Sequence, residues 1–176
     1  MAFTIPSVFQ NYPVHIETSQ DPGMFVVWQK VNGGMRLVSI SRSISRIGFW
    51  SGVLLYVTEG TKFSKANSNV EIANARPEVQ RLFLAFLEEM GLPRYRVRAR
   101  IQLHSLAEKR RAQSYWDGEI GLPHGQYNKP MLSKPSESHR RTTFTLRLRL
   151  NNSMLCALLS YWGDHLEMLK ELLDHL

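Results

Sequence analysis

The chain has 176 residues, of which 43% are hydrophobic and 21% are charged, and it contains 11 glycines, 8 prolines and one cysteine. This composition predicts one folded domain with a small appendage and excludes a disordered tail or a disulfide-rich scaffold. The 22 Lys and Arg residues outnumber the 15 Asp and Glu residues, which gives a formal net charge of +7. A polyanion, and first of all nucleic acid, is therefore the partner that the charge favours.

Features that direct a chain to a membrane or to secretion are missing from the sequence. The longest apolar run, residues 47–57, is about half of the roughly 20 residues needed to span a bilayer. No basic segment precedes an apolar core at the N-terminus, and the lone Cys156 can form neither an internal disulfide nor a cysteine-based zinc site. We therefore expect no membrane partner and a reducing compartment, which is cytoplasmic (in a bacterium, an archaeon or a phage host) or organellar, without secretion.

The positive charge is concentrated in one part of the chain. Residues 92–151 hold 13 Lys or Arg against 4 acidic residues, a local net charge of +9, whereas the remaining residues sum to −2. From residue 152 onward, four acidic residues stand against the single Lys170. This distribution favours one dedicated cationic surface over scattered solubilising charges.

The N-terminal quarter differs in pattern from the rest. Residues 1–23 carry three prolines and no sustained period, which predicts an extended arm without an assignable role. Residues 24–31 and 35–40 are rich in β-branched and aromatic side chains and flank an Asn-Gly-Gly turn, so they predict a β-hairpin. We therefore divide the chain into an arm and hairpin at residues 1–45 and a main domain at residues 46–176.

A glycine-bearing helix is predicted from residue 46 to about residue 58, with Gly60 as a left-handed cap. At 100° per residue, one narrow stripe of this helix carries two glycines, a leucine and a terminal carboxylate: Gly48, Gly52, Leu55 and Glu59. Each glycine costs the helix about 1 kcal/mol in propensity. We therefore expect the two glycines to permit the close approach of another helix.

The following elements alternate between strands and helices. Two strands, 61–66 and 70–75, surround a polar turn, and Pro77 begins a helix that ends before Gly91. Ser105 and Glu108 form a capping box for a helix that extends to about residue 120. Its predicted inner positions are Leu106, Ala112, Tyr115 and Trp116. Residues 121–138 are expected to form either a functional loop or an irregular strand. A strand at 143–150 and a last helix from about residue 152 complete an α+β fold with an antiparallel sheet.

Two of these strands are expected to combine an apolar face with a basic face. Residues 94–104 alternate with period two and point one set of side chains outward: Arg94, Arg96, Arg98, Arg100, Gln102 and His104. The strand at 143–150 adds Arg147 and Arg149. Such a face can enter the major groove, where Arg suits guanine, Gln suits adenine and further cations contact phosphates. Ordinary solvation or edge protection is the alternative, and the arginines in register make it the weaker one.

Residues 48–60, with the sequence GFWSGVLLYVTEG, resemble the motif helix of LAGLIDADG homing endonucleases, in a diverged form that ends in Glu-Gly. The resemblance continues through residues 59–62, 72–79, 102–104 and 127–130 and covers roughly residues 46–165. It points to the single-motif members of the family. It implies an αββαββα unit with a saddle-shaped antiparallel sheet, in which the helix at 105–120 is inserted or shifted between the last two strands.

The resemblance also implies a mechanism. In that family the motif helices of two units pack at a two-fold axis, and each delivers one acidic residue to divalent metal ions between the DNA strands. For this chain it implies a homodimer packed through Gly48, Gly52 and Leu55, with Mg²⁺ (or Mn²⁺) bound at Glu59 and Gly60. The metal would hydrolyse the phosphodiester bond of double-stranded DNA by activating water. Candidates for the polar and basic groups around the metal are Lys129, Gln102 and Lys62.

Three functions remain open at this point. The first is a homodimeric, metal-dependent, site-specific DNA endonuclease, which we take as the working hypothesis. The second is a non-cleaving DNA-binding regulator or an RNA-splicing maturase on the same scaffold. The third is a basic docking surface for an acidic protein. Steep salt dependence of nucleic-acid binding would separate the first two from the third.

Overall fold

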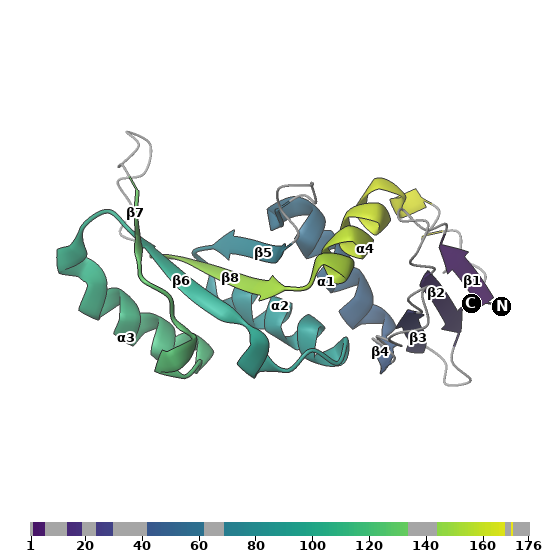
Figure 1. Cartoon of the computed structure of the whole chain (residues 1–176), viewed down its shortest axis with the longest axis horizontal. Helices are drawn as coiled ribbons and strands as arrows, with labels where there is room; N and C mark the ends of the chain where they lie inside the picture. The colour runs from purple at the N-terminus through teal and green to yellow at the C-terminus, as the bar shows by residue number, and fades with distance from the viewer. Residues whose placement is uncertain are drawn as a thin grey trace.

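The computed structural model describes residues 2–5, 14–18, 24–29, 42–61, 69–133, 144–167 and 170. Its fold is α+β, and the described residues form four α-helices (Figure 1). The helices are α1 (Arg46–Glu59), α2 (Pro77–Glu89), α3 (Lys109–Ile120) and α4 (Ser153–Asp164). They pack with a mixed four-stranded sheet in the order β5-β8-β6-β7. Its strands are β5 (Asn69–Asn74), β6 (Arg98–Leu103), β7 (Met131–Leu132) and β8 (Thr145–Asn151).

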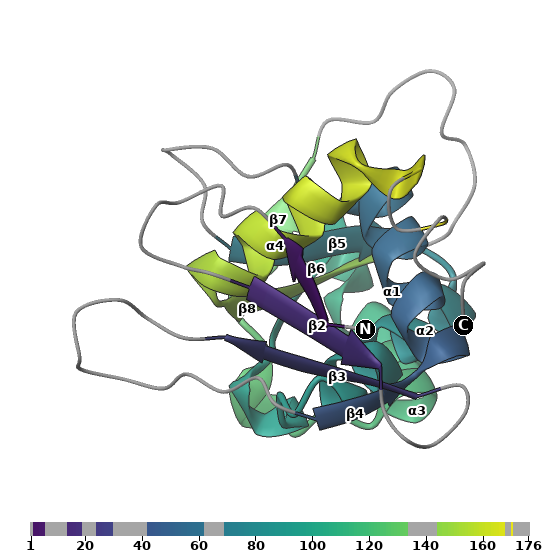
Figure 2. The same cartoon turned by 90° about the vertical axis from the view of Figure 1, so that its right-hand side faces the viewer.

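A second sheet forms the end of the molecule that lies away from α3 (Figures 1 and 2). It is antiparallel and contains β1 (Ala2–Ile5), β2 (Val14–Thr18), β3 (Met24–Gln29) and β4 (Arg42–Ser45), in that order. The extended arm predicted over residues 1–23 thus contains two paired strands, β1 and β2. The three prolines of this segment lie outside the described residues. The predicted strand at 24–31 is confirmed as β3, whereas the predicted turn and the strand at 35–40 lie outside the described residues.

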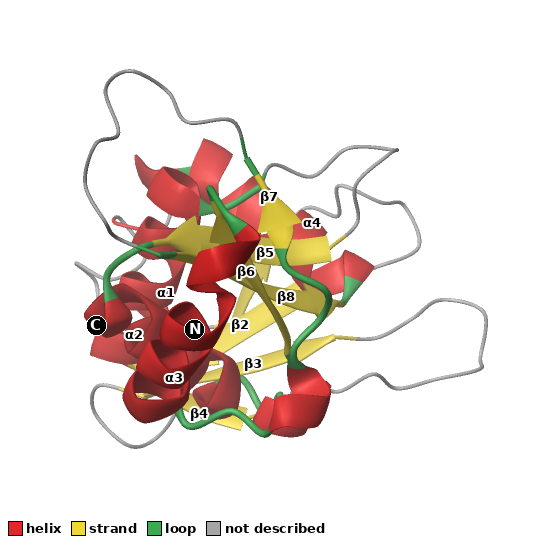
Figure 3. Cartoon of the chain, turned by 90° about the vertical axis from the view of Figure 1, so that its left-hand side faces the viewer, coloured by secondary structure: helices red, strands yellow, loops and turns green. Residues whose placement is uncertain are grey.

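The mixed sheet has one buried face and one solvent face. β8 is antiparallel to both β5 and β6, whereas β7 is parallel to β6. The prediction of a wholly antiparallel sheet was therefore wrong, because the chain returns to the β6 edge in the same direction as β6. The inward side chains are at most 2% exposed: Val70, Ile72, Ala99, Ile101, Leu103, Leu146, Leu148 and Leu150. α2 and α3 lie on that side of the strands (Figures 1 and 3) and contribute Phe83, Leu84 and Trp116 to the same core. The alternation predicted for β6 and β8 is thus confirmed, because burial follows the period of two.

The two glycines of α1 face α2 of the same chain. A Cβ atom at Gly48 would lie 2.6 Å from the carboxylate oxygens of Glu89, and one at Gly52 would overlap the ring of Phe86. Leu55 also packs partly buried against the core. The expected close helix approach is present within the chain, where α2 covers Gly48 and Gly52, and packing of this stripe against a second subunit stays a prediction. Sequence spacing defines a stripe without defining the helix that covers it.

The end of α1 also departs from expectation. Gly60 has φ −82° and ψ 157°, an extended conformation, and it is not the predicted left-handed cap. The chain continues directly into an antiparallel bridge between Gly60 and Ile72 of β5. The backbone must therefore leave the helix extended to pair with the sheet. The predicted strand at 61–66 lies outside the described residues except for Thr61.

The helix α3 begins with the predicted capping box. The Ser105 hydroxyl accepts from the Ala107 amide at 3.2 Å, and the Glu108 carboxylate accepts from the Ser105 amide at 3.2 Å. The first turn, Leu106–Glu108, is a 3₁₀ helix. Leu106, predicted to face inward, is 62% exposed there. Ala112 and Trp116 are buried as predicted, whereas Tyr115 is 39% exposed. Among the described residues, no helix combines the length and the apolarity that crossing a bilayer requires.

Candidate nucleic-acid interface

Four arginines occupy the solvent face of the two inner strands of the mixed sheet. Arg98 and Arg100 belong to β6, and Arg147 and Arg149 belong to β8. The register places Arg98 directly opposite Arg149 and Arg100 directly opposite Arg147. Arg147 is half-buried, and the other three are exposed. We refer to these four residues as the arginine quartet.

The quartet is unfavourable for the isolated fold. Like charges that face each other across a strand pair are destabilising, on a scale of about 0.2–1 kcal/mol per pair. Protection against edge-to-edge aggregation accounts for charges on edge strands, yet β8 is paired with β5 on one side and with β6 on the other. Edge protection therefore does not explain Arg147 and Arg149. An anion bound across β6 and β8 would relieve the repulsion.

Two arginines of the quartet already have partners within the chain. Arg147 Nη1 lies 2.6 Å from Glu71 Oε1 on β5, and Arg98 Nη1 donates to the Gly125 carbonyl at 3.0 Å. In the described part of the chain, no carboxylate forms an ion pair with Arg100 or Arg149. The quartet and Glu71 together carry a net charge of +3, so the face stays cationic.

Glu71 was not among the residues predicted from the sequence. The signal was available, because Glu71 occupies an outward position in the predicted strand 70–75. Its side chain is only 18% exposed. It fixes the guanidinium of Arg147 in one orientation, which reduces the side-chain entropy that a ligand would have to remove.

The structure places some of the remaining predicted DNA-contact residues beside the quartet and others outside the strand. Gln102 lies on the same face and next to the quartet, opposite Thr145, as predicted. His104 follows the end of β6, and its Nδ1 lies 3.4 Å from the Ser133 carbonyl oxygen. The prediction that Arg94 and Arg96 extend the ladder was wrong, because residues Arg94–Arg96 form a 3₁₀ turn, η1.

The turn η1 is held by a buried glutamine from a distant segment. Gln126 Nε2 donates to the Arg94 carbonyl at 2.6 Å and to the Val97 carbonyl at 2.7 Å. Arg94 Nε also forms an ion pair with Glu88 at 2.8 Å. These contacts bend the backbone before β6, so the regular strand starts only at Arg98. Tyr95, at the centre of the turn, is 73% exposed.

The predicted metal ligand Glu59 is exposed at the last position of α1. The following residues join the β5 edge of the sheet, because Gly60 bridges Ile72 and the Thr61 amide donates to the Glu71 carbonyl at 2.9 Å. Tyr56 Oη donates to the Thr61 carbonyl and lies 3.2 Å from Cys156 Sγ. Burial raises the pKa of the Tyr56 phenol, which therefore remains a hydrogen-bond donor at neutral pH. The end of α1 is thus fixed at the sheet edge.

The other predicted catalytic residues do not converge on Glu59 within one chain. Lys129 precedes β7, at the sheet edge opposite β5. Three strand spacings of about 4.8 Å separate these edges, so they are roughly 14 Å apart. Gln102 lies on β6, two strands from β5, and Lys62 lies outside the described residues. Within the described ranges, no group of three or more His, Cys, Asp or Glu residues is arranged to hold a metal ion.

The molecule is therefore an α+β protein with four described helices and a mixed four-stranded sheet, whose solvent face carries an arginine quartet. Comparisons of the chain with protein-family models, with curated proteins and with solved structures gave no match. We therefore infer the function from the geometry of this face.

Proposed function

We propose that the protein binds double-stranded DNA through the arginine quartet on β6 and β8. The observation that carries the proposal is the direct opposition of Arg98 to Arg149 and of Arg100 to Arg147 on two inner strands. Two adjacent strands match the width of the major groove, which is about 12 Å and admits a two-stranded ribbon. Phosphates and guanine edges on the two sides of the groove would accept from these guanidinium groups.

Salt dependence tests this proposal against docking of an acidic protein. Each phosphate neutralised by the protein releases condensed counterions, which lowers log K by about 0.9 per decade of salt. Engagement of three or four arginines should therefore give a slope of about −3 or steeper. The measurement is fluorescence anisotropy of a labelled mixed-sequence duplex between low and physiological salt. A slope near zero would rule out the quartet as a phosphate-binding surface.

The order of elements supports a relationship to the LAGLIDADG scaffold as part of this proposal. The described order α1, β5, α2, β6, β8, α4 would fit an αββαββα unit if the strand expected at 61–66, which lies mostly outside the described residues, were present. α3 and β7 stand between the last two strands of that unit. A non-cleaving DNA-binding regulator or a splicing maturase on this scaffold requires only the basic sheet face.

Metal-dependent DNA cleavage is the second candidate function. It is favoured by the exposure of Glu59 at the end of α1, beside the sheet that carries the quartet. Mg²⁺ commonly uses one or two carboxylates together with phosphate oxygens and water. A second Glu59 would come from a second subunit. Because Gly48 and Gly52 are covered by α2, the α1 surface left for that subunit carries Ile47, Leu54 and Val57, which are 82%, 47% and 40% exposed.

The substitution Glu59→Gln tests this second function. It should lower the rate of Mg²⁺-dependent nicking by more than about 100-fold. Residues that only hydrogen-bond to a metal ligand already contribute about 10- to 100-fold to activity or metal affinity, and a ligand itself should contribute more. Nicking is measured on supercoiled plasmid libraries with Mg²⁺ or Mn²⁺. The matched control is Glu78→Gln, which removes a 73% exposed carboxylate on α2. Equal cleavage by both variants, or a monomer at micromolar concentration with DNA present, would contradict a shared Glu59 site.

A further inference from the structure

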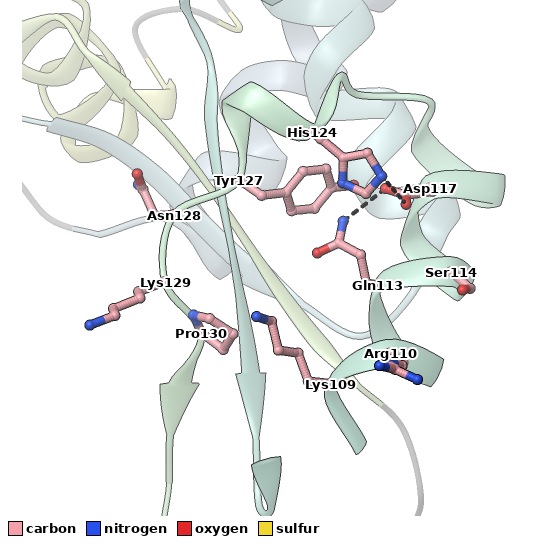
Figure 4. A pocket seen from close by; sticks show the side chains of 10 residues that line it. All are labelled: Lys109, Arg110, Gln113, Ser114, Asp117, His124, Tyr127, Asn128, Lys129 and Pro130. Atoms are coloured by element: carbon pink, nitrogen blue, oxygen red, sulfur yellow. Dashed lines mark hydrogen bonds and ion pairs between the residues drawn. The ribbon is translucent and has the colours of Figure 1, made fainter. Parts of the chain in front are cut away.

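An open pocket lies between α3 and the segment that leads into β7 (Figure 4). Its volume is about 690 Å³, within the range of about 300–1,000 Å³ that is usual for small-molecule sites. Lys109 and Arg110 line it from the first turn of α3, and Lys129 lines it from the opposite segment. The pocket is distinct from the quartet, whose side chains do not line it.

The pocket is positively charged. Within the described residues, no carboxylate forms an ion pair with any of the three cations. Asp117 is the one acidic residue among those that line the pocket. Each of its carboxylate oxygens lies near a nitrogen of another lining residue. Gln113 Nε2 donates to one oxygen at 2.8 Å, and His124 Nε2 lies 3.5 Å from the other. Without the histidine, the three cations and one carboxylate of the lining have a formal net charge of +2.

A buried phenol adds a hydrogen-bond donor to this charge. The Tyr127 ring extends from the segment toward α3 (Figure 4), where its buried hydroxyl lies beside the Asp117 carboxylate without a well-formed hydrogen bond. Burial, with a contribution from the nearby Asp117 carboxylate, raises the pKa of Tyr127, so the phenol stays protonated. The backbone beneath it is fixed, because Tyr127 bridges Ala99 and the Asn128 amide donates to the Ala99 carbonyl at 2.8 Å.

We propose that this pocket binds a phosphomonoester. Such a group carries a charge of about −1.5 to −2 at neutral pH and offers three acceptor oxygens, which matches a pocket of net charge +2 that cations of two segments line. A single carboxylate would neutralise only half of this charge. Charge-assisted hydrogen bonds from Lys109, Arg110 and Lys129 would provide most of the affinity.

Two sources can supply this chemical group: a free nucleoside monophosphate or the 5′-phosphorylated end of a DNA strand. Only the second source rests on the proposed DNA binding. It is compatible with the fold because Arg98 of the quartet donates to Gly125, in the same segment that leads to Tyr127. A strand that lies on the quartet would then end close to the pocket.

Calorimetric titration of the full chain with AMP, with inorganic phosphate and with adenosine tests the pocket in the absence of DNA. AMP and phosphate should bind and adenosine should not. The double substitution Lys109→Gln/Lys129→Gln should weaken AMP binding by about tenfold or more, because hydrogen bonds to charged groups are among the strongest in proteins. Tyr127→Phe, which removes only the hydroxyl, should weaken it severalfold. The control Lys170→Gln removes an exposed lysine outside the pocket and should bind AMP as the unaltered protein does.

A pair of duplexes that differ only in a 5′-phosphate distinguishes the two sources. If the strand end is the ligand, the phosphorylated duplex binds more tightly, and Lys109→Gln/Lys129→Gln removes the difference. If the free nucleotide is the ligand, AMP binds and the two duplexes are equal. Absence of AMP and phosphate binding together with equal duplexes would refute the pocket proposal, as would AMP binding that the double substitution leaves unchanged. Either result would leave DNA binding by the quartet standing, because its salt-dependence test uses a different surface.

Discussion

The double substitution Arg100→Gln/Arg149→Gln is expected to weaken duplex DNA binding by at least about 30-fold without destabilising the protein. Each arginine contact to a base edge is worth about 1–3 kcal/mol, and 1.4 kcal/mol is a factor of ten in affinity. The substitutions break both opposed pairs of the quartet, Arg98 with Arg149 and Arg100 with Arg147. The substitutions remove these repulsions but also the favourable position of Arg149 opposite Glu71 on β5, so the free energy of unfolding should stay unchanged within about 1 kcal/mol.

Anisotropy with a labelled duplex measures the affinity and its salt slope, and urea unfolding measures the stability. If both arginines contact phosphates instead, the slope becomes shallower by about two. The matched control is Arg94→Gln/Arg96→Gln, which removes the same charge from the turn η1, outside the quartet. Equal losses in the two double variants would mean that net charge, and not the quartet, determines binding. Cooperative unfolding of the quartet variant would mean that these side chains support the core.

Gly52→Ala is expected to lower the free energy of unfolding by about 2 kcal/mol. An alanine Cβ would overlap the Phe86 ring, and Phe86 is 1% exposed, so the ring has no free space to enter. Overpacking of this kind costs about 1–3 kcal/mol and occasionally more, which outweighs the roughly 1 kcal/mol that alanine gains over glycine in a helix. Urea unfolding at two protein concentrations provides the measurement.

The control for this substitution lies in another helix of the same chain. Gly118 occupies α3, and a Cβ built there meets no atom within 4 Å. Gly118→Ala should therefore stabilise the protein by about 1 kcal/mol through helix propensity alone. If Gly52→Ala proved as stable as Gly118→Ala, α1 would not be packed on α2 through this residue. A destabilisation that depended on protein concentration would instead indicate that the glycine stripe meets a second subunit.

Several features followed from local sequence patterns. Alternation of period two predicted that Gln102 and the quartet share one face of the sheet, and exposure along β6 and β8 agrees with it. The capping box of Ser105 and Glu108 predicted the start of the 3₁₀ turn that leads into α3, because its hydrogen bonds join residues two and three apart in sequence. These features involve neighbours in the chain, so the sequence contains the information they require.

Other features depend on contacts between distant segments. The bend before β6 is fixed by Gln126, some thirty residues later in the chain, so the alternation of residues 94–97 was misleading. The pocket joins α3 to the segment before β7, and Lys129 lies there with Lys109, far from the expected metal site. No local pattern in the sequence signals either contact.

The amino-acid sequence by itself determined the α+β class, the two faces of β6 and β8, and the glycine stripe of α1. Only the tertiary structure decided that this stripe packs on Phe86 and Glu89 of α2, and that Arg98 and Arg100 face Arg149 and Arg147. The physical reason is that side-chain periodicity fixes which residues share a face of one element. The element that covers this face is selected by the packing of the whole chain, in which burial of apolar surface is largely non-directional.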